Sequence, residues 1–94
     1  MARTGRYCCY EYFGDGDPMF GGAADDRTLG KDGRFLTRSH TWKDHATFAT
    51  AAEAKSAGER APNKREGGLI STGEEIVPDW VTGGEYCRAM SGAA

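Results

Sequence analysis

Five residues carry the sulfur and nitrogen atoms that could bind zinc or form a nucleophile and its base: Cys8, Cys9, Cys87, His40 and His45. They are numerous enough for a tetrahedral zinc site. Zinc ligands usually come in pairs about two to four residues apart on a turn, whereas Cys8 and Cys9 are adjacent and would point to opposite faces of a strand. A reactive thiolate needs a nearby base or positive charge, and no such signature surrounds these cysteines. We therefore expect no enzyme activity, metal or cofactor, and favour buried core cysteines over a disulfide.

Residues 14–33 are rich in glycine and aspartate, the residue types of calcium and phosphate loops. The run from Asp15 to Phe20 lacks a third ligand at the next alternate position and a glycine at the sixth, so it does not match an EF-hand. Its glycines also lack the Lys-Ser/Thr pair of a phosphate loop. Six glycines and one proline within 14–33 exclude a long regular element. We expect a long loop here, of the kind that is usually functional or mobile.

Charge alternates in blocks along the chain, although the net charge is only −2. Residues 1–13 carry +1, residues 14–33 carry −3, residues 34–65 carry +4 and residues 66–94 carry −4. If the two acidic blocks meet on one face of the fold, that face would attract a basic partner by long-range steering. The alternative is that aspartate and glycine only keep surface loops solvated.

Trp80 is the residue that we expect to anchor a partner. It lies between turn signals in the segment 78–83, and tryptophan is enriched among the residues that dominate interface energetics. The predicted partner-binding set joins this indole to acidic residues of both acidic blocks: Glu74, Glu75, Asp79, Asp15, Asp17, Asp25 and Asp26. The other tryptophan, Trp42, is expected to close the core near the start of a helix.

The basic block supports a second hypothesis, a nucleic-acid-associated accessory protein. Five cations of this block would contact phosphates: Arg34, Arg38, Lys43, Lys64 and Arg65. Trp42 or Phe35 would then provide a stacking platform for bases. Because the rest of the chain would repel phosphate, we favour a protein or ribonucleoprotein partner over nucleic acid alone.

The 94 residues are expected to form a single α+β domain over residues 1–94. Large aliphatic residues number seven and aromatic residues ten, so the core must be largely aromatic. Aromatic and β-branched runs between turn signals predict strands at 7–13, 34–37, 69–72, 75–77 and 85–90. These strands would make a small antiparallel sheet of four to five strands with one helix packed on a face, and residues 91–94 would be frayed.

The helix is predicted by a local signal. Thr50-Ala51-Ala52-Glu53 matches a capping box, in which the Thr hydroxyl and the Glu carboxylate each accept a backbone N–H of the first turn. The helix should begin at Ala51, and Pro62 should end it by residue 61. Its apolar face consists of alanines, which would let it lie close to the sheet.

No stretch approaches the roughly 18 apolar residues of a membrane span, and the chain has no apolar signal core near Met1. We therefore expect a soluble, cytoplasmic protein without a membrane partner. A chain this short buries little apolar area and leaves strand edges exposed, so we also expect a homodimer.

Residues 33–54 carry a resemblance: a run from Gly33 to Thr37, then Trp42, then a capped run from Ala46 to Ala54. This pattern resembles small orphan proteins of bacteriophages and mobile elements, in which a strand, a turn with Trp and a capped helix form a compact β-β-α unit. In size and style the chain is similar to anti-CRISPR and related anti-defence proteins, which bind a host complex and block it. The resemblance covers about a quarter of the chain. It implies a non-enzymatic inhibitor of a host complex in the host cytosol and brings no catalytic residue.

Overall fold

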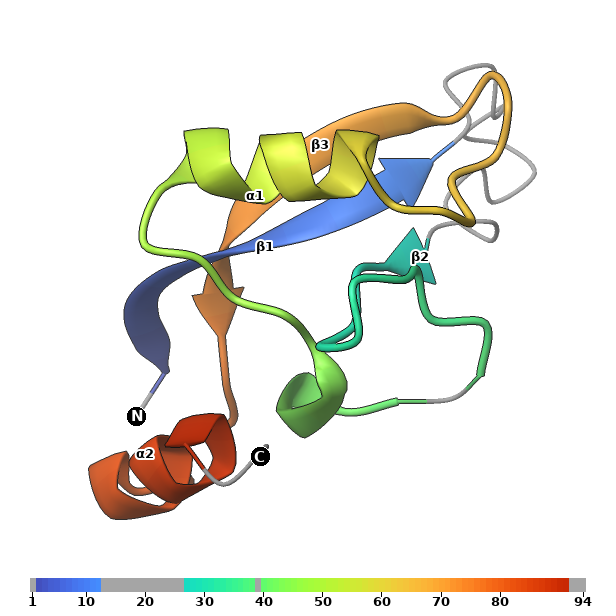
Figure 1. Ribbon diagram of the computed structural model, residues 1–94. Helices are drawn as coiled ribbons and strands as arrows, with labels where there is room; N and C mark the ends of the chain where they lie inside the picture. Colours follow the sequence, from blue (N-terminus) through green and yellow to red (C-terminus); the bar gives the residue numbers. More distant parts are fainter. Residues whose placement is uncertain (1, 13–26, 39, 92–94) are drawn as a thin grey trace, which may run out of the picture.

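The computed structural model describes residues 2–12, 27–38 and 40–91. Its elements are, in order, β1 (Arg3–Tyr12), β2 (Arg27–Thr28), the 3-10 helix η3 (Trp42–Asp44), α1 (Ala51–Glu59), β3 (Leu69–Ile76) and α2 (Gly83–Ser91) (Figure 1). The strands form an antiparallel sheet in the order β2-β1-β3. The α+β class and the antiparallel sheet are confirmed. The described residues form three strands and two α-helices, instead of the expected four to five strands and one helix.

β1 is the central strand of the sheet, and β3 is its longer neighbour. Their register places Cys9 opposite Thr72, with an irregularity between Arg3 and Tyr7. β3 runs unbroken through Gly73, where two separate short strands were expected. The Tyr10 ring lies 3.3 Å from the position that a Gly73 Cβ would take, so it covers the space left by the missing side chain.

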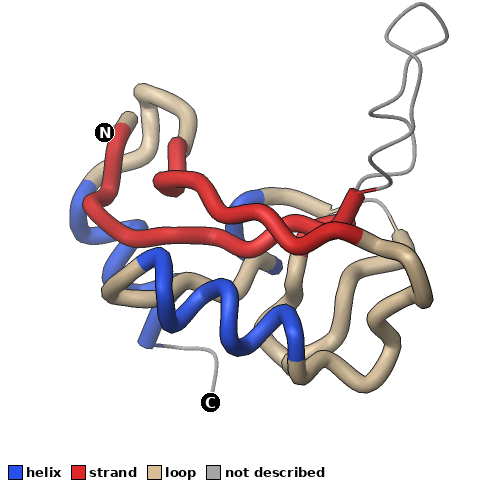
Figure 2. The backbone as a smooth tube through the Cα atoms, turned by 90° about the horizontal axis from the view of Figure 1, so that it is seen from above, coloured by secondary structure: helices blue, strands red, loops and turns tan. Residues whose placement is uncertain are grey.

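α1 and the connecting segments lie on one face of this sheet (Figure 2). The helix begins at Ala51 as predicted, and the Thr50 hydroxyl accepts the backbone N–H of Glu53 at 3.2 Å. Ala54 is fully buried, and a Cβ at Gly58 would collide with the Cys9 sulfur. α1 therefore approaches β1 as closely as its small side chains allow.

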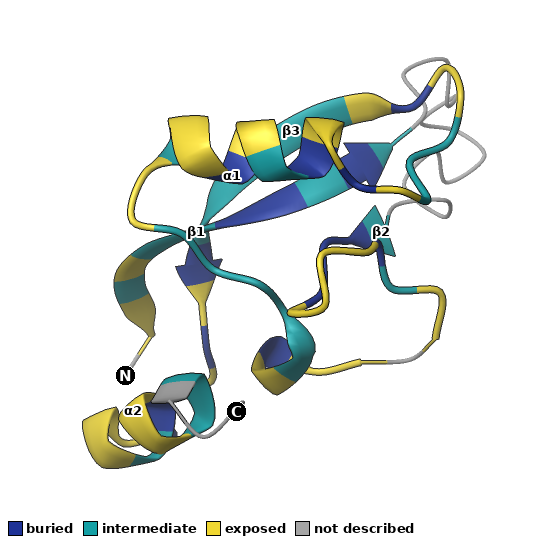
Figure 3. Cartoon of the chain, viewed as in Figure 1, coloured by how far each residue is buried: buried dark blue, intermediate teal, exposed yellow. Residues whose placement is uncertain are grey.

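Most of the buried hydrophobic residues belong to one of two clusters (Figure 3). The first cluster, between α1 and the sheet, contains Cys9, Leu29, Phe35, Ala54 and Ala61. The second cluster, beside α2, contains Trp42, Val77, Val81 and Tyr86. Trp42 is buried as expected, but it stacks on Tyr86, with ring centroids 5.7 Å apart, and does not pack at the start of α1.

The predicted strand at 34–37 does not form; Phe35 makes only an isolated bridge with Leu29. The physical reason is that the Asn63 side chain, in place of a neighbouring strand, forms the hydrogen bonds of the Phe35 backbone. The Asn63 amide accepts the Phe35 N–H and donates to the Phe35 carbonyl, both at 2.8 Å. The expected β-β-α unit of 33–54 is thus a bridge, a 3-10 helix and α1, and β2 forms earlier, within the predicted loop.

The predicted strand at 85–90 is wrong, because this segment is the helix α2. The Thr82 hydroxyl accepts the Glu85 N–H at 3.0 Å and so caps the helix. Tyr86, Ala89 and Met90 recur at helical spacing and pack in the second cluster. Thr82-Gly83-Gly84-Glu85 has the same Thr-x-x-Glu pattern as the start of α1, although its two glycines favour a turn.

Four expectations are not tested by the described residues: the long loop, the frayed C-terminus, the single domain and the homodimer. Most of the loop predicted at 14–33 and the C-terminal residues 92–94 lie outside the described residues. No helix in the described part of the chain is long and apolar enough to cross a membrane. β3 is an edge strand whose outer side forms no backbone hydrogen bonds with another described element, and the single domain and the homodimer stay predictions.

Candidate functional site

Trp80 lies on a tight turn at the surface. Its side chain is 71% exposed, whereas Val77 and Val81 on either side are buried in the second cluster. The Val81 N–H donates to the Pro78 carbonyl at 3.0 Å and closes the turn. The backbone that carries the indole is therefore held in place from both sides, while the indole itself faces solvent.

The segment 74–80 also presents an apolar and two acidic side chains. Ile76 is 65% exposed, and Asp79 is exposed. Glu74 forms an ion pair with Arg3 at 3.5 Å, which is weak because both groups are in contact with water. Segment 74–80 thus combines two exposed hydrophobic residues with negative charge.

Glu75 does not belong to this surface, which corrects the expectation that it contacts a partner. It is 2% exposed, and its Oε1 accepts a hydrogen bond from the Tyr86 hydroxyl. Its Oε2 has no hydrogen-bond partner among the described residues. Adjacent residues of a strand point to opposite faces, so Glu74 and Glu75 could not both face one partner.

The contact with Glu75 connects α2 to β3. Burial, and then the hydrogen bond to the Glu75 carboxylate, raise the pKa of the Tyr86 hydroxyl. The phenol therefore stays protonated at neutral pH and serves as a donor. The four residues of the other acidic block that were expected to bind a partner, Asp15, Asp17, Asp25 and Asp26, lie outside the described residues.

The thiols divide into two classes. Cys8 and Cys9 are buried in the sheet, and burial raises the pKa of each to about 11, so both are protonated at neutral pH. Cys87 is exposed on α2, and all three cysteines are free of disulfides. His40 Nδ1 and His45 Nε2 lie 2.6 Å apart. Among the described residues, no group of three or more His, Cys, Asp or Glu side chains converges on one point.

The basic block does not expose the aromatic platform that nucleic-acid binding would require. Both Trp42 and Phe35 are buried. Arg65 donates to the Glu11 carboxylate at 2.6 Å, and Arg38 pairs with Asp44 at 3.4 Å. Two of the five proposed phosphate contacts therefore have acidic partners within the protein.

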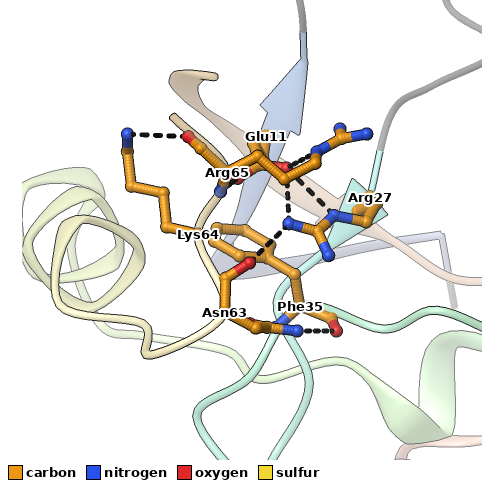
Figure 4. Close-up of polar contacts among 6 residues, drawn as sticks. All are labelled: Glu11, Arg27, Phe35, Asn63, Lys64 and Arg65. Atoms are coloured by element: carbon orange, nitrogen blue, oxygen red, sulfur yellow. Dashed lines mark hydrogen bonds and ion pairs between the residues drawn. The ribbon is translucent and has the colours of Figure 1, made fainter. Parts of the chain in front are cut away.

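Glu11 is fully buried and organises a polar cluster (Figure 4). Its carboxylate accepts Arg27 Nη2 at 2.7 Å and both the backbone N–H and the Nε of Arg65, at 2.7 and 2.6 Å. Burial alone would raise the pKa of Glu11, but these bonds outweigh it and hold the pKa below its ordinary value. Arg27 also donates to the Asn63 carbonyl at 2.8 Å. The cluster fixes the neighbouring strands β1 and β2 to the segment after α1, which is a structural role.

A groove of about 920 Å³ runs between the first and second clusters. Apolar side chains line it, among them Leu29, Phe48 and Met90. Of the described residues in its wall, three are basic and none is acidic: Arg6, Lys31 and His45. Sequence reasoning missed this inter-cluster groove, because its walls come from β1, the segments 29–33 and 45–48, and both α-helices.

Comparison of the chain with protein-family models, curated protein sequences and solved structures finds no match.

Proposed function

We propose that this chain is a non-enzymatic binding protein that covers a site on a macromolecular partner, with Trp80 at the centre of the contact. The observation that carries the proposal is the position of the indole, 71% exposed between two buried valines. Monomeric surfaces seldom leave such a large ring in water, and tryptophan is among the residues that dominate interface energies.

The rigidity of the turn favours affinity. A side chain that must be ordered on binding loses conformational entropy at that moment, and a chain segment that is already fixed avoids part of this cost. Val77 and Val81 hold the backbone on both sides of Trp80. Ile76, four residues before Trp80, is a second exposed hydrophobic side chain of the same segment.

The charge of the segment selects a basic partner surface. Asp79 and Glu74 lie on either side of Ile76, and their carboxylates would steer a positively charged partner and fix its register. A basic surface that binds nucleic acid in a host ribonucleoprotein complex has this chemistry. The resemblance to anti-defence proteins makes occlusion of such a complex the function that we favour.

The test uses the parent, Trp80→Ala and a control, Leu69→Ala, which removes another exposed apolar side chain outside segment 74–80. Each serves as bait on an extract of the natural host, and the captured macromolecule is purified and titrated by calorimetry. We expect Trp80→Ala to weaken binding by about 2 kcal/mol or more, roughly thirtyfold, and Leu69→Ala to change it little. The melting temperature of both variants should stay near that of the parent.

Equal affinity of the parent and Trp80→Ala would contradict the proposal. So would a sharp fall in the melting temperature of Trp80→Ala, which would make the ring a core residue. The double variant Glu74→Lys/Asp79→Lys should mainly slow association and flatten its salt dependence. A captured nucleic acid with steeply salt-dependent affinity would instead support the nucleic-acid hypothesis.

A further inference from the structure

The inter-cluster groove is suited in size and lining to a small molecule. Its volume of about 920 Å³ lies within the range of roughly 300–1,000 Å³ typical of ligand pockets. Phe48 and Ala57, which are partly exposed, contribute apolar surface from the first cluster side, and Met90 contributes it from α2. Methionine adapts its shape to irregular partners, which favours binding of a flexible apolar chain.

The extended segment 45–48 brings the basic side chains together. On one side it bridges residues 29–31, through the pair Gly30 and His45 and the bond from the Ala46 N–H to the Leu29 carbonyl at 2.9 Å. On the other side, Phe48 bridges Tyr7 of β1. Lys31 follows Gly30 in the chain, and Arg6 precedes Tyr7. Cations from two distant parts of the chain therefore line one groove.

Arg6 and Lys31 are held in place by neutral acceptors. Arg6 donates from Nε to the Thr47 hydroxyl at 2.8 Å and from Nη2 to the Thr47 carbonyl at 3.0 Å. Lys31 donates to the Ala89 carbonyl at 2.9 Å. No carboxylate in the described part of the chain forms an ion pair with either cation. Both positive charges are therefore positioned but not neutralised, in a protein whose net charge is −2.

We propose that the inter-cluster groove binds a small anionic amphiphile, a medium-chain carboxylic acid, with its carboxylate at Arg6 and Lys31 and its apolar chain along Phe48, Ala57 and Met90. The remaining N–H groups of the guanidinium and the ammonium supply charge-assisted hydrogen bonds to the carboxylate. Burial of the methylene chain removes apolar surface from water and adds to the affinity with each CH₂ that the groove covers. This site is separate from Trp80 and does not depend on the macromolecular partner.

The experiment titrates the protein with sodium decanoate, followed by calorimetry and by ¹H–¹⁵N NMR spectra, at concentrations below micelle formation. Decanol tests whether the ligand must be charged, and decyltrimethylammonium tests the sign of that charge. Acetate tests the contribution of the apolar tail. We expect decanoate to bind with a stoichiometry of one, and to shift amides of residues 29–31, 45–48 and 86–90. The alcohol and the cation should bind at least about tenfold more weakly, since each lacks the charge-assisted bonds, and acetate should not bind measurably.

Two variants locate the ligand. Lys31→Gln removes one charge and should weaken decanoate about tenfold, whereas Lys55→Gln, on the exposed face of α1, should leave its affinity unchanged. Cys87→Trp starts from an exposed position and fills the groove, so it should abolish binding without lowering the melting temperature. Binding that survives Cys87→Trp, an equal loss in Lys55→Gln, or equal affinity for decanol would overturn the proposal. Binding only to micelles or vesicles would identify a lipid surface and would also overturn it.

Discussion

The first and second clusters each bury hydrophobic side chains beside an α-helix, but they use different side chains to do so. The first cluster contains two alanines and a cysteine, and it depends on the close approach of α1 to β1 at Gly58. The second cluster contains no alanine among its buried members and depends on the stacked rings of Trp42 and Tyr86. Apart from Phe35 and Leu29, the first cluster relies on small residues that bury little area each and therefore needs an extended contact between α1 and β1, whereas the second is built from a few large contacts between short elements.

The difference between the two clusters also bears on the two proposed binding surfaces. Segment 74–80, which carries Trp80, ends at the second cluster, and the groove lies between the two clusters. α2 contributes to both features and is attached to the sheet by Tyr86 and its bond to Glu75. We infer that the first cluster supports the fold as a whole and the second mainly sets the position of the binding surfaces.

Removal of the largest ring from each cluster tests this division most directly. Phe35→Ala and Trp42→Ala should each cost about 3–5 kcal/mol of local packing. Phe35→Ala should unfold the whole chain, because Phe35 is buried where α1, β1 and the Asn63 segment meet. Trp42→Ala should release α2 but leave β1, β3 and α1 in place. Amide hydrogen exchange, read residue by residue, would refute the division if both variants lost protection throughout.

Gly58→Ala tests the close approach in the first cluster. Alanine favours a helix interior by up to about 1 kcal/mol, but the added Cβ would collide with the Cys9 sulfur. We expect a net loss of about 1–3 kcal/mol in urea denaturation. Cys9→Ala in the same chain should recover most of this loss, because it removes the atom in the way. A stabilised Gly58→Ala protein would contradict the packing of α1 on β1.

Removal of either helix cap should have the smallest effect on stability of these changes. The two removals should again affect the two clusters differently. Thr50→Ala and Thr82→Ala each remove a hydroxyl that accepts a first-turn N–H, at a cost of about 1 kcal/mol. Thr50→Ala should lower global stability in thermal melts. Thr82→Ala should mainly increase hydrogen exchange in α2. Serine at either position should restore the parent behaviour, and a Thr50→Ala melt that matches the parent would place the start of α1 elsewhere.

Local sequence signals accounted for the first cluster better than for the second. The cap at Thr50, the alanine face of α1 and residues 7–12 of β1 follow from the sequence, because short-range hydrogen bonding and side-chain alternation determine them, whereas the start of β1 at Arg3 was not predicted. α2 was missed although Thr82 and Glu85 carry the same capping pattern as α1. Two glycines in its first turn suggested a loop, and packing of Tyr86 against Trp42 outweighs their low helix propensity.

The α+β class and the start of α1 follow from the sequence alone, since each depends on residues close together in the chain, whereas for Cys8 and Cys9 the sequence only favoured a buried core position over a disulfide or a metal site. The folded arrangement was needed to show that Glu75 is buried against Tyr86, that Asn63 replaces a strand beside Phe35, and that Arg6 and Lys31 line one groove. In these cases the partner lies 11 or more residues away, as with Glu75 and Tyr86, or reaches the site from another element. Burial and pairing of a polar side chain depend on which distant atoms surround it, and residue type and spacing alone do not specify those atoms.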